Sequence, residues 1–448
     1  MIRPSILLLL ALCPLLIQAQ LFNVRDYGAV GDGVTNDQIA IQKAVDACEQ
    51  AGVGTVILSG GVFLSGQVKL TSNMTLQIDS SATLLGIQSD SEEAYPHGII
   101  QTKFPNRMEQ DCQRRLLYGD RVQNVKITGG GTIDGQGDFE PWMNVKELGT
   151  EKDRPSLLAF VGSKNIEVSD LTLLEPACWT QVYIESDSIV LRDLTINSRN
   201  LTPNRDGIDI VDCHHVLIEN CNIKSEDDGI CFKSGSEYGV KDVVVRNCVI
   251  DKLNVPAGNC FKLGTDGLGS FMDFDISGLT LKNAFQNSGI VIESMDGAVI
   301  DNINFSDCTI ENSGQAIFML LADRRRTVPG RKTRIGTISN VHFKNITGKN
   351  FTQQYPSIVT GIPGHNIQNV TFENVVLEVK GGIDQTGQSV MEYDGKYPEG
   401  SKFGPTNAHG FFLRHVDQVD FVNCEITTSE EDARPWMMKE DVGSINIK

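Results

Sequence analysis

The sequence is short of positive charge, of long hydrophobic runs and of paired cysteines, and each shortage excludes a class of protein. Of its 448 residues, 39 are Lys or Arg and 57 are Asp or Glu, so the formal net charge is -18. Nucleic acid is a poor partner for such a chain, because phosphates attract an excess of Lys and Arg. Beyond the amino terminus no stretch is apolar enough to span a membrane. Eleven cysteines are present, but no pair of them has the spacing of a zinc site.

The amino-terminal segment, residues 1–19, has the pattern of a secretory signal peptide. Arg3 precedes an apolar run over Ile6–Ile17, and Ala19 supplies the small residue of a cleavage site. The run is too short for a membrane-spanning helix. The sequence therefore predicts a secreted or periplasmic protein with a mature chain of residues 20–448.

Most of the mature chain repeats one pattern, in which alternate positions are apolar on either side of an Asn or Asp turn residue. Ile166–Leu173 is one copy and Val216–Ile223 is another. Copies begin at Ile166, Ile189, Val216, Val243, Phe274, Ile303, Val341, Val370 and Val419, at steps of 23 to 49 residues. Short strands that recur in this way, with no helix between them, predict an all-β solenoid of parallel strands, a parallel β-helix.

Two residue types recur at the turn of this repeat. Asn tolerates the left-handed backbone conformation of tight turns, so we expect a stacked ladder of Asn side chains. Its members would be Asn220, Asn247, Asn345, Asn374 and Asn423. Cysteines occupy the next position in several copies, at Cys221, Cys248, Cys308 and Cys424. We interpret these cysteines as small buried stacking residues rather than as a disulfide framework.

A single domain with capped ends is the expected organisation. Helical periodicity occurs over Asp37–Gln50, which predicts one short amphipathic helix that caps the open end of the core. We divide the mature chain into an amino-terminal cap (20–54), coils (55–428) and a polar carboxy-terminal tail (429–448), in which Trp436 packs on the last coil. Nothing in this arrangement requires an obligate oligomer, so we expect a monomer.

Three acidic residues at the ends of short apolar strands carry the candidate chemistry: Asp206, Asp227 and Asp228. Adjacent carboxylates repel each other, which raises at least one pKa, and a general acid that works near neutral pH needs such a rise. The 21 residues from Asp206 to Asp227 are close to one coil of the repeat. We therefore expect the three carboxylates to meet on one face of the solenoid.

Two motifs around these residues resemble the signatures of the polygalacturonase family of glycoside hydrolases, family 28. Asn204–Asp209 is similar to Asn-Thr-Asp-Gly-Ile-Asp, and Asp227–Gly235 is similar to Asp-Asp-Cys-Ile-Ala-Ile-Lys-Ser-Gly. The resemblance implies a right-handed parallel β-helix, a polysaccharide or oligosaccharide substrate, hydrolysis with inversion, and no cofactor or metal. Asp227 would then match the general acid, while Asp206 and Asp228 would match the pair that activates water. Asn204 and Lys233, in the same motifs, would contact substrate.

Two further signatures of that family are altered here. Asn259 stands where the third signature has His, and Val291-Ile292-Glu293 aligns with the Arg-Ile-Lys of the fourth. In the family this Arg and Lys hold the carboxylate of galacturonate, which requires positive charge. The changes predict a sugar that is neutral at this position, such as rhamnose or galactose in a branched pectin or another polysaccharide. Glu293 fits two roles equally: a hydrogen bond to sugar hydroxyls, or an ion pair with Lys262, itself a candidate substrate contact.

Other candidate contacts carry alternative interpretations. Arg324 begins a basic loop that either contacts an anionic group at the edge of the cleft or is simply solvated. Trp142, Trp179 and Tyr183 are candidate platforms for sugar stacking, although Trp179 fits burial between coils equally well.

Two other functions compete with hydrolysis. A polysaccharide lyase shares the fold class, but the lost Arg and Lys leave no obvious base for proton abstraction. A non-catalytic carbohydrate-binding β-helix would explain the lost His, Arg and Lys, but it would not require an intact acid and base. The sequence does not distinguish cleavage within a chain from cleavage at its end.

Overall fold

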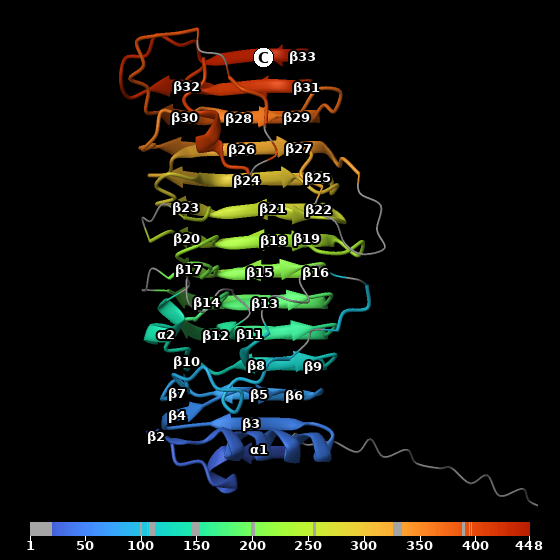
Figure 1. Cartoon of the computed structure of the whole chain (residues 1–448), viewed down its shortest axis with the longest axis vertical. Helices are drawn as coiled ribbons and strands as arrows, with labels where there is room; N and C mark the ends of the chain where they lie inside the picture. Colours follow the sequence, from blue (N-terminus) through green and yellow to red (C-terminus); the bar gives the residue numbers. More distant parts are fainter. Residues whose placement is uncertain are drawn as a thin grey trace, which may run out of the picture.

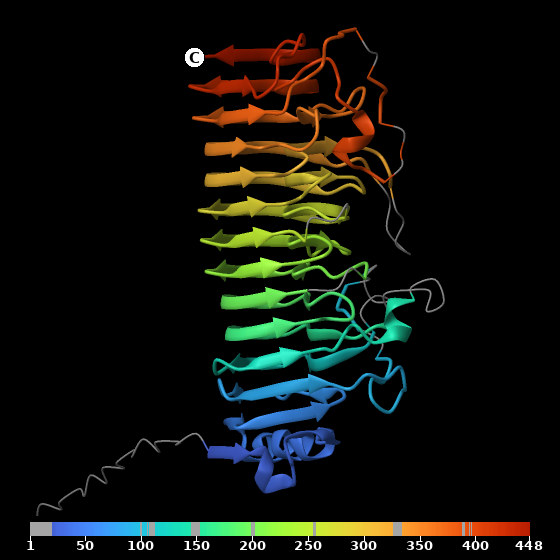
Figure 2. The same ribbon diagram turned by 90° about the vertical axis from the view of Figure 1, so that its left-hand side faces the viewer.

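The computed structural model describes residues 20–98, 101–104, 106, 113–144, 153–198, 202–253, 257–325, 334–387, 390–393, 395 and 397–448. The segment interpreted as a signal peptide lies outside these residues. The chain winds into a stack of coils, and Figures 1 and 2 show the coils following one another from the amino to the carboxyl end. All strand pairings between successive coils are parallel, and parallel crossovers are right-handed. The predicted right-handed parallel β-helix is confirmed.

The strands form three faces. Face 1 contains β1 (Gln20–Asn23), β3 (Gly54–Leu58), β6 (Met74–Ile78), β9 (Gln123–Thr128), β12 (Lys164–Leu174), β14 (Asp187–Asn197), β16 (His214–Glu219), β19 (Val240–Arg246), β22 (Ser270–Ser277), β25 (Val299–Glu311), β27 (Thr337–Lys349), β29 (Gln368–Glu373), β31 (Phe411–Val422) and β33 (Met437–Ile447). Face 2 contains β2 (Asp32–Asn36), β4 (Gly61–Ser65), β7 (Ala82–Gly86), β10 (Thr132–Asp134), β17 (Asn222–Lys224), β20 (Val249–Asp251), β23 (Thr280–Lys282), β30 (Val376–Val379), β32 (Glu425–Thr428) and the ends of the longest face 1 strands. Face 3 contains β5 (Val68–Lys69), β8 (Arg115–Asp120), β11 (Ser156–Val161), β13 (Gln181–Ile184), β15 (Ile208–Val211), β18 (Ile230–Ser234), β21 (Phe261–Gly267), β24 (Ser288–Ser294), β26 (Gln315–Leu321), β28 (Ser357–Thr360) and the first residues of β31 and β33.

The alternating pattern of the sequence produces the core. On faces 1 and 2 every second side chain is buried, so the apolar positions of the repeat point inward and stack from coil to coil. One such stack is aromatic, with Phe343 against Phe372 at 5.2 Å between ring centroids and Phe372 against Phe421 at 5.0 Å. Offset ring stacking at these distances adds to the burial energy of the core.

The five predicted Asn residues all have left-handed backbone, with φ between 52° and 56°. Hydrogen bonds join Asn345, Asn374 and Asn423 into a ladder, whereas Asn220 donates to Asp193. Asn374 donates a hydrogen bond to Asn345 (2.9 Å) and accepts one from Asn423 (2.8 Å). The predicted cysteine stack is also confirmed: Cys221, Cys248 and Cys308 are buried, Cys424 is half-buried, and all four are free thiols.

The two ends of the solenoid differ in how well the sequence predicted them. Helix α1 (Gln38–Ala51) covers the first coils through Ile41, Ala44, Val45 and Cys48, which confirms the predicted cap. The short helices η1 (Val24–Tyr27) and α2 (Glu140–Met143) lie in connections. The predicted tail contains β33 instead, which pairs with β31, and Trp436 packs on Phe421. The predicted polar tail is therefore corrected to a further strand. The sequence of β33 lacks the alternating apolar pattern because many of its side chains are exposed at the end of the stack.

Candidate active site

Face 3 differs from the other two faces because its strands are buried on both sides. Every residue of β13, β15, β18, β24 and β26 is buried, whereas exposed positions recur along β16 and β19. Connecting segments therefore cover the outer side of face 3. All the residues predicted to carry chemistry lie on or beside this face.

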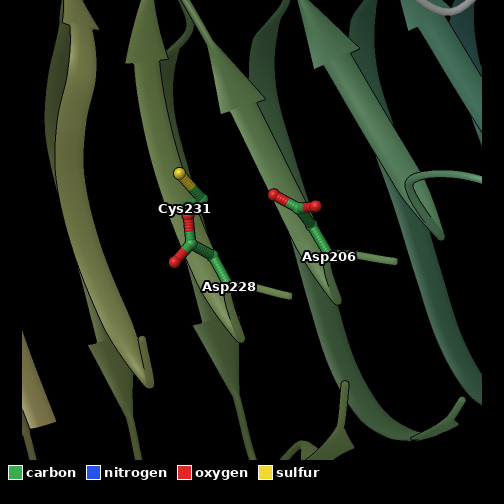
Figure 3. A group of neighbouring side chains, drawn as sticks. All are labelled: Asp206, Asp228 and Cys231. Atoms are coloured by element: carbon green, nitrogen blue, oxygen red, sulfur yellow. The ribbon is translucent and has the colours of Figure 1, made fainter. Parts of the chain in front are cut away.

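Coil stacking brings the predicted acids together. Asp206 precedes β15, Asp227 and Asp228 precede β18, and the two strands pair in register. Gly207 sits where a Cβ would lie 2.5 Å from the carbonyl oxygen of Gly229. A side chain cannot fit there, so the Gly after each acid lets consecutive coils approach closely. Figure 3 shows Asp206 and Asp228 side by side, with one carboxylate oxygen of each within 4.8 Å.

Two buried lysines neutralise this cluster. Lys233 Nζ donates to Asp206 Oδ2 at 3.3 Å and also bonds Asp209, which lies on β15. Lys262 Nζ donates to Asp228 Oδ2 at 3.0 Å and to the hydroxyl of Tyr397 at 3.1 Å. Each lysine is therefore paired with at least one carboxylate of the cluster. Such pairs offset the free-energy cost of burying a charge.

The environment separates the carboxylates into two kinds. Burial and the charge of Asp209 raise the pKa of Asp206 well above its usual value, although Lys233 opposes them. Burial likewise raises the pKa of Asp209 to about 6, again against the effect of Lys233. Burial also disfavours the charged form of Asp228, but Lys262 and Lys233 outweigh it and hold its pKa at about 2. At neutral pH Asp228 is a carboxylate, whereas burial and the charge of Asp209 disfavour the ionised form of Asp206, a contrast that suits shared use of one water.

Asp227 is the most accessible of the three predicted acids. It is half-buried, while Asp206 and Asp228 are each 3% exposed. Its carboxylate accepts a hydrogen bond from the backbone N–H of Asp228 at 2.9 Å. Its carbonyl oxygen accepts bonds from Ser225 and Lys252, which fix the backbone at this point. The side chain can therefore reach a ligand without moving the rest of the cluster.

The two predicted Asn contacts have different roles. Asn259 donates to Asp228 Oδ1 from its backbone N–H (2.7 Å) and from its side chain (3.2 Å), and its Oδ1 accepts from Ser288 N–H at 3.0 Å. It thus orients the ionised carboxylate. Asn204 has a left-handed φ of 65°, and its side-chain oxygen accepts from Arg154 at 2.9 Å. Asn204 therefore closes the turn before Asp206.

Glu293 and Arg324 differ from their simplest sequence interpretations. Glu293 is 1% exposed, and its Oε2 has no hydrogen-bond partner in the described structure. Burial raises its pKa to about 7, against the opposing effect of Lys262. The lysine donates to Asp228 instead, so the predicted ion pair between Lys262 and Glu293 is not formed. Arg324 is not solvated: it bonds Asp266 at 2.9 Å and Asp296 at 3.0 Å. Three later basic residues of its loop, at positions 326, 331 and 332, lie outside the described residues.

The prediction that aromatic side chains form platforms for sugar stacking is wrong for Trp142 and Tyr183. Both are 0% exposed: Trp142 lies in a connection and packs on Tyr95 and Phe139, whereas Tyr183 belongs to β13 and stacks on Phe160 in the core. Trp179 is 7% exposed, with the Lys233 ammonium 4.4 Å from a ring centroid, so its alternative interpretation as a buried residue is correct. Tyr397 was missed. It belongs to a connection far along the chain, and no spacing ties it to the acids.

The donor atoms of the cluster suit proton transfer better than a cation. One oxygen each of Asp206 and Asp228 and the Cys231 sulfur lie within 4.8 Å of one another. Burial raises the pKa of the Cys231 thiol well above its usual value, so the sulfur is a poor ligand. Lys233 and Lys262 already supply positive charge at the carboxylates.

Two cavities are lined by residues outside the cluster. One of about 330 Å³ is lined by residues that include Glu392, Pro398 and Phe403. The other, of about 440 Å³, is lined by residues that include Phe104 and Tyr238. Neither is lined by the carboxylates or lysines described above.

Comparison with known proteins assigns this arrangement to a family. The model of the family described as glycosyl hydrolases family 28 matches residues 48–393. A probable polygalacturonase of Vitis vinifera is 29% identical over 338 residues, 65% of this chain and 69% of the relative. An exopolygalacturonase of Zea mays is 26% identical over 389 residues, 82% of this chain and 85% of the relative. The solved structure of an exopolygalacturonase from Thermotoga maritima superposes with a TM-score of 0.70 at 20% identity, covering 92% of this chain and 93% of that one.

Proposed function

The chain belongs to glycosyl hydrolase family 28 and is a glycoside hydrolase of the polygalacturonase type, and we propose that it hydrolyses its substrate by single displacement with Asp206, Asp227 and Asp228. In this mechanism Asp227 donates a proton to the leaving oxygen, and Asp228, assisted by Asp206, activates the attacking water. Inverting hydrolases keep the acid and base roughly 6.5–9.5 Å apart, so that water fits between base and sugar. The family assignment favours this reaction over the lyase and the binding module.

The observation that carries the proposal is the contrast between Asp228 and Asp206. Asp228 has a pKa of about 2 and is ionised throughout the working range of an enzyme, as a base must be. The neighbouring Asp206 Oδ1 is buried and has no hydrogen-bond partner in the described structure. A water between these oxygens would lose a proton to Asp228 while Asp206 holds it in place. The half-buried Asp227 is then the carboxyl group left to reach the glycosidic oxygen.

The stereochemistry of the first product tests this mechanism. Inversion predicts that NMR spectra taken in the first minutes of hydrolysis show the anomer opposite to that of the substrate linkage. Retention of configuration would contradict single displacement. Asp227→Asn should recover turnover on an aryl glycoside with a good leaving group, because such a group needs no proton, whereas Asp228→Asn should not recover.

We also propose that the sugar at the central subsites is neutral. Val291 is 2% exposed, and Glu293 would repel a uronate carboxylate if it ionised. Three cations beside the cluster are already paired: Lys233 with Asp206 and Asp209, Lys262 with Asp228, and Arg324 with Asp266 and Asp296. None of them supplies the free positive charge that a carboxylate of the substrate needs.

A polymer screen tests the substrate. Galacturonan, rhamnogalacturonan, galactan and algal polysaccharides are incubated with the enzyme and with Asp227→Asn, and new reducing ends are counted. We expect cleavage of a neutral or mixed polymer and none of galacturonan. The double variant Val291→Arg/Glu293→Lys should bind galacturonate oligomers about 10- to 100-fold more tightly, as charge-assisted hydrogen bonds allow. Val291→Gln/Glu293→Gln is the uncharged control, and equal binding by both variants would refute the assignment.

Export is the last part of the proposal. It rests on the signal-peptide pattern of residues 1–19. In the described part of the chain no helix has the length and apolarity needed to cross a membrane. Amino-terminal sequencing of protein recovered from the periplasm or the medium should begin close to Gln20, and a mature protein that starts at Met1 would contradict export by this signal.

A further inference from the structure

A buried lysine lies behind the proposed acid. Lys252 follows β20 at the turn toward face 3 and is 2% exposed. Its Nζ donates to the carbonyl oxygens of Ser225 (3.2 Å) and Glu226 (2.8 Å), to the Ser225 hydroxyl (3.2 Å) and to the carbonyl oxygen of Asp227. All four oxygens belong to three consecutive residues of the preceding coil that end at Asp227. Lys252 therefore holds the backbone from which the Asp227 side chain projects.

These bonds indicate that Lys252 carries its positive charge. Four acceptor oxygens surround Nζ, and only the protonated ammonium has three hydrogens to share among them. Burial lowers the pKa of Lys252, and the negative charge of Asp227 is the largest of the effects that oppose burial, followed by that of Asp228. The ammonium thus acts on the Asp227 carboxylate through its charge, while its hydrogen bonds go to the backbone.

Lys252 differs in this respect from the two lysines of the cluster. Lys233 and Lys262 each bond a carboxylate, whereas the oxygens that accept from Lys252 are uncharged. When Asp227 gives its proton to the leaving oxygen, it gains negative charge beside this ammonium. The attraction between the two groups is therefore strongest in the transition state, which is the condition for a contribution to the rate.

We infer that Lys252 is a positioning residue for the general acid: it fixes the backbone of Asp227 and stabilises the carboxylate that this residue becomes as it donates its proton. The inference rests on the proposed function, because it needs Asp227 as the proton donor. Lys252 is buried too deeply to touch the substrate, so it acts through Asp227. Its loss should lower kcat and leave KM nearly unchanged.

Glu226 is the other carboxyl group that acts on this lysine. It is 4% exposed, and its Oε2 has no hydrogen-bond partner in the described structure. Burial and the charge of Asp227 raise the pKa of Glu226 to about 7, against the opposing effect of Lys252. At mildly acidic pH Glu226 is therefore mostly protonated, and it leaves the charge of Lys252 available to Asp227.

Two substrates separate this role from a merely structural one. Lys252→Met is assayed on a polymer that the native enzyme cleaves and on an aryl glycoside of the same sugar, whose good leaving group needs no proton. We expect kcat on the polymer to fall about 10- to 100-fold, a part of the 10²- to 10⁴-fold that general acid catalysis contributes. The rate on the aryl glycoside should stay within a few-fold of the native rate. Equal losses on both substrates would overturn the inference, because a structural defect slows both.

The ratio of the two rates does not depend on how much of a variant folds, because the same folded molecules act on both substrates. Lys252→Gln is the second variant. Its amide still donates to the backbone carbonyls but carries no charge, so it should change the ratio in the same direction as Lys252→Met. A native ratio in Lys252→Gln would show that the charge of Lys252 has no part in the reaction.

Lys380 provides the matched control. It follows β30 as Lys252 follows β20, and Figure 1 shows both strands at the left edge of the stack. Its Nζ donates to the carbonyl oxygen of Thr352 in the preceding coil at 3.3 Å. Lys380→Met should keep the native ratio of rates, because its coil is remote from the Asp cluster. The same change of ratio in Lys380→Met would refute a role specific to Lys252.

Two further variants show which claim fails. If Asp227→Asn slows both substrates equally, Asp227 is not the proton donor, and the proposed function fails together with the inference. If Asp227→Asn spares the aryl glycoside and Lys252→Met does not, the inference alone fails. Glu226→Gln/Lys252→Met should be as slow on the polymer as Lys252→Met. Recovery of the native rate in this double variant would show that Lys252 only balances Glu226, against the inference.

Discussion

Two neighbouring pairs of coils on face 3 differ in how closely their residues match the signatures of the family. The coils of β15 and β18 keep the motif residues Asp206, Asp227 and Asp228, of which Asp206 and Asp228 are buried and Asp227 is half-buried. The coils of β21 and β24 carry Asn259, Val291 and Glu293 where the family signatures have His, Arg and Lys. The reaction groups are therefore preserved beside altered recognition groups.

The difference teaches how a solenoid separates chemistry from specificity. Each coil contacts only its neighbours, so a substitution in one coil leaves the backbone of the next in place. The two pairs of coils still meet at the catalytic cluster, because Lys262 on β21 and Asn259 before it both bond Asp228 beside β18. Variants on either side of this contact show how far the separation holds.

The largest effect should follow a change in the preserved coils. In Asp227→Asn the proton donor is lost, and general acid catalysis contributes about 10²- to 10⁴-fold in rate. Because Asp227 is half-buried and bonds mainly the Asp228 backbone, the protein should keep its melting temperature and bind its substrate as before. Turnover and substrate affinity are measured side by side. A rate within a few-fold of the native enzyme would show that another group delivers the proton.

Lys262→Met tests the contact between the two pairs of coils. Loss of one partner from a buried ion pair costs about 3–5 kcal/mol, so the variant should unfold at a lower denaturant concentration. The low pKa of Asp228 contributes stability that is present above its unfolded value of 3.8 and is lost as pH falls toward 2. Without the lysine this pKa rises, so both the loss of stability and the acid limb of the pH–rate profile should move to higher pH.

An exposed pair provides the control for Lys262. Lys344 and Glu373 also lie 3.0 Å apart, but on the outside of face 1. Lys344→Met should change stability little, because water screens exposed pairs. If Lys262→Met and Lys344→Met lower the free energy of unfolding equally, the buried contact between β21 and β18 stabilises the protein no more than an exposed ion pair does. The two pairs of coils are then more independent than we argue.

Glu293→Gln tests the altered coils alone. Burial raises the pKa of this carboxyl from 4.5 to about 7, so the folded protein binds a proton that the unfolded chain has released. Stability from this group therefore falls as pH rises from about 4.5 to 7, by roughly 3 kcal/mol in all. The variant should match the native protein at pH near 5 and exceed it at pH near 8. The exposed Glu425→Gln controls for the loss of one negative charge, and a constant difference at both pH values would contradict the burial argument.

The sequence predicted the parts of this molecule that depend on local pattern. Alternating apolar positions and turn Asn residues specify each coil from its own residues, so the β-helix, the ladder at Asn374 and the cap α1 followed directly. The meeting of Asp206 with Asp227 also followed, because the motif spacing is close to one coil.

What the sequence did not predict depends on contacts between distant segments. Tyr397 lies in a connection after β30, yet it bonds Lys262 on β21. No periodic pattern in the sequence predicts that this connecting segment contacts an earlier coil. The burial of Trp142 and Glu293 has the same origin, because connecting segments cover face 3. The pKa values of Asp206 and Asp228 shift in opposite directions because Asp209 lies beside the first and Lys262 beside the second, and that is a property of side-chain geometry.

The smallest effect should come from a coil remote from both pairs. Asn374 has a left-handed φ of 55° and bonds Asn345 and Asn423. Asn374→Ala loses these bonds and keeps a Cβ in a left-handed conformation that costs alanine about 1–2 kcal/mol, whereas Asn374→Gly loses the bonds but has no Cβ and avoids that strain. Alanine should therefore destabilise the protein more than glycine does, and both variants should keep native turnover, since a change in one coil is felt only by its neighbours. Turnover is measured at a temperature where each variant remains folded. Reduced turnover in either variant would show that a distortion at Asn374 reaches the Asp cluster through the intervening coils. Catalysis and coil stability would then not be separable in this solenoid.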